Sequence, residues 1–123
     1  MKSYRDLEIY QMAYQLAIEI HKMSLTLPKY ELYEQGSQIR RSSKSVKDNI
    51  VEGYGRKKYK NDFIRFLVYA QASCDEATSQ LSMISDLHFS EIPLTKLNED
   101  YNILGKKINK FIQYVEGNWK YNK

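Results

Sequence analysis

The sequence predicts an all-α protein, an antiparallel up-down-up-down four-helix bundle. Three observations support this fold class. Apolar residues recur at intervals of three and four along four long segments. The 123 residues include only five glycines and two prolines, too few for the many turns of a β-sandwich or barrel. The breaks between the segments are short, which makes consecutive helices run antiparallel.

The four helices are expected within one domain, over residues 4–25, 31–52, 62–88 and 94–119 of the 123. Pro28 separates the first two, because proline cannot continue a helix and restricts the residue before it. Gly53 is expected as the C-terminal cap of the second helix, and Asn61 as the N-cap of the third. Pro93 stands in the break before the fourth.

Each of the last three helices carries a single apolar stripe, which predicts one buried face and one face in water. The third stripe contains Phe63, Phe66, Leu67, Ala70, Cys74, Ala77, Leu81 and Ile84. The fourth contains Leu94, Leu97, Tyr101, Leu104, Ile108, Phe111, Val115 and Trp119. The second is thinner and contains Leu32, Ile39, Ser43, Val46 and Ile50.

The first helix differs, because it carries two apolar stripes. One contains Leu7, Tyr10, Tyr14 and Ala17, and the other contains Ile9, Met12, Leu16, Ile20 and Met23. A helix that is apolar around most of its girth is buried on more than one side. The second stripe therefore predicts an oligomer interface, with a second copy of the chain as the commonest partner. The alternative is that both stripes form one broad internal face.

The net charge of +4 is unevenly distributed along the chain. Residues 40–60 carry an excess of six positive charges and residues 105–123 an excess of four, whereas residues 61–104 carry an excess of five negative charges. Such segregation indicates what the protein binds rather than how it folds.

The basic segment is the strongest candidate binding site. Lys and Arg side chains interleaved with Tyr54 and Tyr59 suit phosphates and unstacked bases. We therefore predict a nucleic-acid-binding surface formed by Arg40, Arg41, Lys44, Lys47, Arg56, Lys57, Lys58 and Lys60. The alternative is a solvated helix face that keeps the protein soluble, with Arg40 or Arg41 paired to acids of the third helix.

No residue pattern indicates catalysis, a metal or a cofactor. His21 and His88 lie on different helices without metal-ligand spacing, and Cys74 falls on a core stripe beside acidic residues that disfavour a thiolate. No apolar run reaches the length of a membrane span, and the N-terminus lacks the apolar stretch of a signal peptide. We expect a cytoplasmic protein that is not an enzyme.

Three motifs resemble a known family. The stretch Gln38-Ile39-Arg40-Arg41-Ser42-Ser43, followed by Ser45-Val46 and by Asn49-Ile50-Val51-Glu52-Gly53, is similar to the signature of the 23S rRNA intervening-sequence proteins. Tyr4-Arg5-Asp6-Leu7 resembles the family's start, and Phe63, Phe66-Leu67 and Ser73-Cys74-Asp75-Glu76 resemble its third-helix pattern. Two positions depart from the pattern, Tyr10 where the family often has Trp and Lys47 where it often has Pro.

The resemblance implies a small cytoplasmic bacterial helical bundle without known enzyme activity. Relatives of this fold assemble as ring-like homopentamers, so the resemblance implies a pentamer, with a dimer as the alternative. A related accessory protein of diversity-generating retroelements is a basic pentamer that binds nucleic acid and a reverse transcriptase. The family name describes where genes were found, in inserts of ribosomal RNA genes, and does not by itself imply action on ribosomal RNA.

Two hypotheses of function follow. The first is a non-enzymatic oligomer that binds RNA or DNA through the basic segment. The second is a protein-interaction scaffold without a nucleic-acid role, which the first helix and the acidic third quarter of the chain favour. Salt-dependent binding to RNA would favour the first hypothesis.

Overall fold

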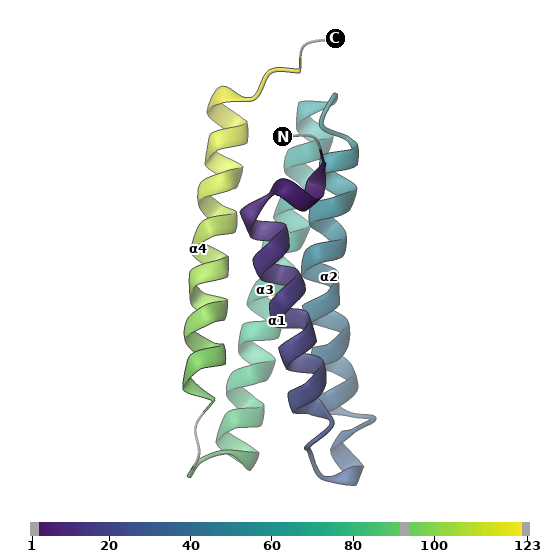
Figure 1. The fold of residues 1–123 in the computed structure, drawn as a ribbon, viewed down its shortest axis with the longest axis vertical. Helices are drawn as coiled ribbons and strands as arrows, with labels where there is room; N and C mark the ends of the chain where they lie inside the picture. Colours follow the sequence, from purple (N-terminus) through teal and green to yellow (C-terminus); the bar gives the residue numbers. More distant parts are fainter. Residues whose placement is uncertain (1–2, 92–93, 122–123) are drawn as a thin grey trace.

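The computed structural model describes residues 3–91 and 94–121. Its four α-helices are α1 (Glu8–Ser24), α2 (Gln35–Gly55), α3 (Lys60–His88) and α4 (Thr95–Asn118), with two short 3-10 turns, η1 (Tyr4–Asp6) and η2 (Lys29–Glu31). In Figure 1, α1 and α3 run downward and α2 and α4 run upward. The described residues contain no strand. The predicted antiparallel four-helix bundle is therefore confirmed.

The helix boundaries differ from the prediction at the starts of α1 and α2 and at the connection between α2 and α3. α2 continues through Gly53 to Gly55, and no glycine in the described residues has a positive φ. The prediction that Gly53 caps the helix is therefore wrong. A Cβ at Gly53 would lie 3.2 Å from Phe66 Cβ and 3.3 Å from Phe63 Cδ1, so the missing side chain lets α2 approach α3 closely.

Two further boundaries are corrected. α3 begins at Lys60 with Tyr59 as its N-cap, so Asn61 lies inside the helix rather than before it. Of the residues expected to open the second helix, Glu31 ends η2 and residues 32–34 form a turn, so α2 starts only at Gln35. α1 ends at Ser24, before Pro28, as predicted, whereas the break predicted at Pro93 lies outside the described residues.

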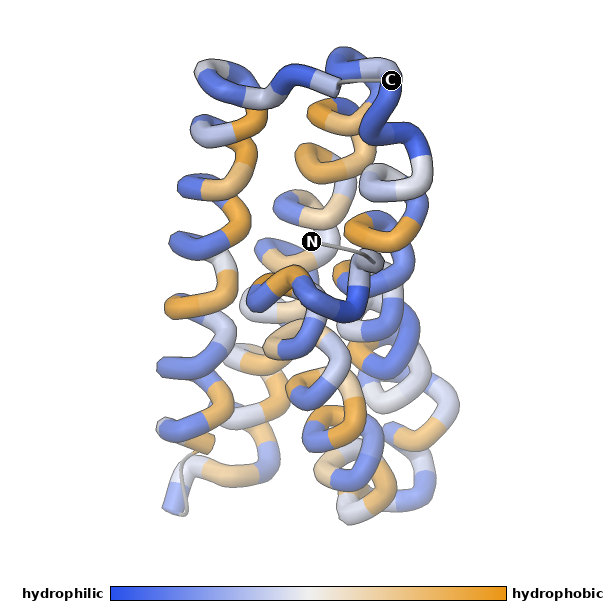
Figure 2. Tube along the Cα trace, turned by 45° about the horizontal axis from the view of Figure 1, so that its top comes forward, coloured by the Kyte–Doolittle hydropathy of each residue, from blue (hydrophilic) through white to orange (hydrophobic). Residues whose placement is uncertain are grey.

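All four helices contribute to one hydrophobic core. Figure 2 shows this for α4, where hydrophobic residues turn toward the other helices and hydrophilic residues turn away. The largest fully buried side chains include Phe63, Leu67, Tyr101 and Ile108, from α3 and α4. The stripes predicted for these two helices therefore face the core. Leu94, Leu97, Phe111 and Trp119 are partly buried against it, and Phe66 is also only partly buried.

The apolar residues of α1 predicted to form an oligomer interface lie inside the bundle instead. Ile9, Leu16, Ile20 and Met23 are buried inside the bundle, and Met12 packs against the core. The physical reason is that α1 packs against both α2 and α4, so a helix of this bundle buries two sides rather than one. The exposed apolar side chains of α1 are instead Tyr14 and Ile18.

Candidate nucleic-acid interface

The fold divides the basic segment into two groups. Arg40, Arg41, Lys44 and Lys47 lie within α2, whereas Arg56, Lys57, Lys58 and Lys60 lie at and just after its end, where the chain turns into α3. An α-helix rises about 1.5 Å per residue, so Arg40 and Arg56 are about 24 Å apart along the axis. The predicted surface is therefore two sites. We call the second group, with Tyr59, the upper corner, because it lies at the upper end of the bundle in Figure 1.

Arg40 has a structural role. Its guanidinium donates from Nη1 to Ser24 Oγ at 2.9 Å and from Nη2 to the carbonyl of Leu32 at 2.7 Å. Both acceptors belong to the end of α1 and the connection that follows it. The guanidinium predicted to contact phosphate instead holds this connection against α2, so Arg40 is not part of the candidate interface. It pairs with no acid of α3 in the described residues.

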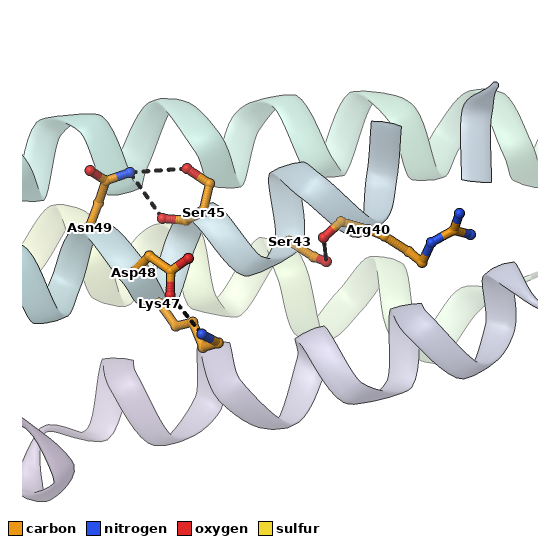
Figure 3. A network of polar contacts seen from close by, with 6 residues as sticks. All are labelled: Arg40, Ser43, Ser45, Lys47, Asp48 and Asn49. Carbon is orange, nitrogen blue, oxygen red and sulfur yellow. Dashed lines mark hydrogen bonds and ion pairs between the residues drawn. The ribbon is translucent and has the colours of Figure 1, made fainter. Parts of the chain in front are cut away.

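The other three basic residues within α2 face two different helices. Lys44 and Lys47 line a groove between α1 and α2, and Arg41 lines a polar groove between α2 and α3. The ammonium of Lys47 lies 2.6 Å from Asp48 Oδ1. Figure 3 shows this pair together with Asn49, which donates to the carbonyl and hydroxyl of Ser45. No single surface collects these three cations.

The upper corner, by contrast, has uncompensated positive charge. Two carboxylates close to it in sequence are paired with arginines: Glu52 Oε2 lies 2.6 Å from Arg56 Nη1, and Asp62 Oδ1 lies 3.1 Å from Arg65 Nη2. Within the described residues, no ion pair involves Lys57, Lys58 or Lys60. The positive charge of these three lysines is therefore not neutralised by an ion pair in the described residues. The first N–H groups of α3, which no side chain caps, add partial positive charge beside them.

Aromatic rings underlie the cations of the upper corner. The Arg56 guanidinium carbon lies 4.4 Å from the Phe66 ring centre, and the Lys57 ammonium lies 4.2 Å from that of Tyr54. Both distances suit cation–π attraction. Tyr54 is buried and packs edge-on against Phe63, whereas Tyr59 is 61% exposed. One tyrosine therefore anchors the corner and the other faces solvent.

Trp119 fixes the backbone of the upper corner, which the sequence did not reveal. Its indole Nε1 donates to the carbonyl of Lys57 at 3.0 Å, and its ring packs edge-on against Phe63, with centroids 5.1 Å apart. The apolar spacing predicted Trp119 as the last core residue of the fourth helix. That spacing carries no information about a contact with a residue 62 positions earlier.

Cys74 and His88, two residues capable of covalent or acid–base chemistry, make structural contacts. Cys74 is buried, and burial together with the charge of Asp75 raises the pKa of its thiol to about 11, which disfavours the thiolate. His88 Nε2 lies 2.7 Å from Glu31 Oε2 at the lower end of the bundle. His21 is half-buried in the groove between α1 and α2. No three His, Cys, Asp or Glu side chains of the described residues are placed to hold a metal.

None of the helices formed by the described residues has the length and apolar character needed to cross a membrane.

Comparisons with known proteins agree with this architecture. The crystal structure of a protein of unknown function from the S23 ribosomal protein family of Bacteroides thetaiotaomicron VPI-5482 superposes with a TM-score of 0.71 at 21% identity, covering 85% of this chain and 98% of that one. This likeness supports the fold alone. A search of curated proteins finds no match. The family model for the 23S rRNA-intervening sequence protein matches residues 5–110. The chain therefore belongs to the 23S rRNA-intervening sequence protein family.

Proposed function

We propose that this protein is a non-enzymatic, oligomeric helical bundle that binds RNA or DNA through its upper corner. The observation that carries the proposal is the set of three lysines, Lys57, Lys58 and Lys60, which form no ion pair within the described residues and stand around an exposed tyrosine. Arg56 strengthens the same surface through its side chain over Phe66. Arg41, Lys44 and Lys47 are secondary contacts on other faces of the bundle.

The expected binding depends on charge more than on sequence. Lysine ammonium groups contact phosphate oxygens, which carry no base identity, so many sequences should bind. Each neutralised phosphate releases counterions, and the logarithm of the affinity should therefore fall steeply with the logarithm of salt concentration. Several copies of the corner in one oligomer would strengthen weak contacts by avidity.

The test is a salt titration of RNA binding, with a variant that removes the three lysines. Replacing Lys57, Lys58 and Lys60 with Ala should weaken binding at low salt and reduce the salt slope by about 2, because each phosphate contact contributes about 0.7–0.9 to it. The matched control replaces Lys29, Lys96 and Lys106, exposed lysines outside the corner, and loses the same charge. Equal loss in both variants would show that only net charge matters. No retention of RNA or DNA by micromolar protein would refute the proposal.

Self-association is a second proposal, and complementary surfaces support it. The groove between α1 and α2 exposes Tyr14 and Ile18 beside Lys22 and Lys44. The outer face of α3 carries the exposed acidic residues Asp75 and Glu76 and also exposes the apolar side chains of Val68, Tyr69 and Met83. Contacts between two different faces of identical chains build rings when the rotation closes. The family resemblance favours a pentamer, and a dimer is the alternative.

Sedimentation at micromolar concentration tests self-association. The double variant Tyr14→Glu with Ile18→Glu should dissociate the oligomer, because it places negative charges opposite the acidic face of α3. Replacing Asn102 and Asn109, exposed polar residues of α4, with Glu is the control and should leave the oligomer intact. A wild-type monomer would refute this proposal. An oligomer that binds a protein partner but no RNA would favour the scaffold function instead.

A further inference from the structure

We propose that the upper corner is selective for single-stranded over double-stranded nucleic acid, because Tyr59 provides a surface on which an unpaired base stacks. This inference rests on the proposed function and adds the class of nucleic acid to it. Phosphate contacts from lysines serve single and double strands alike, so they cannot set this preference. An exposed aromatic ring between such lysines can set this preference, because an unpaired base can stack on it.

A comparison of Tyr59 with Tyr54, the tyrosine that packs beneath the upper corner, shows what is unusual about Tyr59. Tyr54 is 6% exposed, and its ring contacts Phe63 and the Lys57 ammonium, so its role in packing is clear. Tyr59 is 61% exposed, and among the described residues its ring has one aromatic or cationic neighbour, the Lys58 ammonium 5.7 Å from the ring centre. Core packing therefore does not account for an aromatic side chain at residue 59.

The backbone that carries Tyr59 is held on both sides. The N–H of Tyr59 donates to the carbonyl of Arg56 at 2.8 Å, and its carbonyl accepts from the N–H of Phe63 at 3.0 Å. Trp119 holds the carbonyl of Lys57 at 3.0 Å, two residues earlier. The backbone of Tyr59 is thus held in place by hydrogen bonds, while most of its side chain is exposed to solvent. Less conformational freedom is then lost when a base stacks on the ring.

The charges around Tyr59 suit a phosphate next to a stacked base. Lys58 and Lys60 flank it in sequence, and the nearby carboxylates Glu52 and Asp62 are already paired with Arg56 and Arg65. In a duplex, the faces of the bases are covered by their neighbours, and the backbone presents only sugar and phosphate to a protruding ring. In a single strand, a base can turn out and lie against the ring while its phosphates meet the lysines.

The test measures, by fluorescence anisotropy at about 50 mM salt, the binding of a labelled 12-nucleotide RNA without self-complementarity and of the same RNA annealed to its complement. The wild-type protein should bind the single strand at least fivefold more tightly. Tyr59→Ala should lose fivefold or more for the single strand and little for the duplex, whereas Tyr59→Phe, which keeps the stacking ring, should bind as the wild type does.

The matched control is Tyr33→Ala, since Tyr33 is 83% exposed but lies outside the corner, in the connection before α2. It should change neither affinity. Equal wild-type affinity for both forms, or an equal loss of both in Tyr59→Ala, overturns this inference and leaves the proposed function standing. Absence of binding to either form overturns the proposed function and this inference with it.

Discussion

The two ends of the bundle use basic side chains in opposite ways. At the lower end, the connection between α1 and α2 is held by Arg40, whose guanidinium bonds to Ser24 and Leu32. At the upper end, Lys57, Lys58 and Lys60 form no ion pair within the described residues. These residues belong to one basic run in the sequence. What separates them is whether the fold brings an acceptor within reach.

The lower end also contains a buried carboxylate. Glu31 is 3% exposed, and its Oε2 lies 2.7 Å from His88 Nε2 and accepts from Gln35 Nε2 at 2.7 Å. These contacts join η2 to the end of α3 and the start of α2. The hydrogen bond with His88 is the main reason why the pKa of Glu31 lies below its usual 4.5. Polar contacts at this end therefore stabilise the fold, whereas those at the upper end leave charge available for a ligand.

The largest expected effect comes from breaking the lower end at Arg40. Arg40→Ala should lower the free energy of unfolding by about 2–3 kcal/mol. It removes hydrogen bonds made by a charged donor and leaves the carbonyl of the half-buried Leu32 without its hydrogen-bond donor. Urea unfolding followed by circular dichroism measures the loss. Arg41→Ala is the control, since Arg41 is exposed and should change stability by less than about 0.5 kcal/mol. Equal stability of the two variants would contradict the structural role of Arg40.

The second prediction concerns acid, because the stability that Glu31 contributes at neutral pH is lost when the pH is low. Because the pKa of Glu31 is lower in the folded than in the unfolded protein, its contribution to stability is complete above about pH 4.5 and is lost as the pH falls through the folded pKa. Glu31→Gln should therefore make the urea midpoint less dependent on pH between 5 and 3. Glu34→Gln, at an exposed neighbouring residue, is the control and should preserve the wild-type dependence.

The architecture could be predicted from the sequence because helical periodicity is a local property. Apolar residues recur every three or four positions from Phe63 to Ile84, and a helix with this pattern buries that one face against the other helices of a bundle. The first helix shows the limit of this reasoning. Its two stripes indicated burial on two sides, but periodicity could not say whether the second neighbour was another copy or α4 of the same chain.

The candidate site was predictable only as a region. Charge and tyrosine content located the segment 40–60, but they assigned the same role to Arg40 and to Lys57. The distinction depends on contacts between residues far apart in the chain, such as Arg40 with Ser24 and Trp119 with Lys57. Gly53 was misread for the same reason, since its conformation is helical and its small size matters only against Phe63 and Phe66.

The third prediction tests the hold of α4 on the upper corner. Trp119→Phe keeps an aromatic ring against Phe63 but removes the hydrogen bond to the Lys57 carbonyl, so it should cost about 1 kcal/mol in urea unfolding. The cost is smaller than for Arg40→Ala because water can reach the upper corner and replace the lost donor. Tyr121→Phe, at an exposed residue two positions later, is the control and should be neutral. A loss as large as that of Arg40→Ala would mean that the corner is as tightly closed as the lower end.

The smallest expected effect uses one glycine from each end. A Cβ added at Gly55 meets no atom within 4 Å, and Gly55 is helical, so Gly55→Ala should raise stability by about 0.5–1 kcal/mol through helix propensity. A Cβ added at Gly36 would lie 2.9 Å from the Glu31 carbonyl oxygen and 3.0 Å from Arg40 Nη1. Gly36→Ala should therefore lower stability, because the backbone of the lower connection must move. Urea midpoints that shift in the same direction for both variants would contradict the difference between an open upper end and a closed lower end.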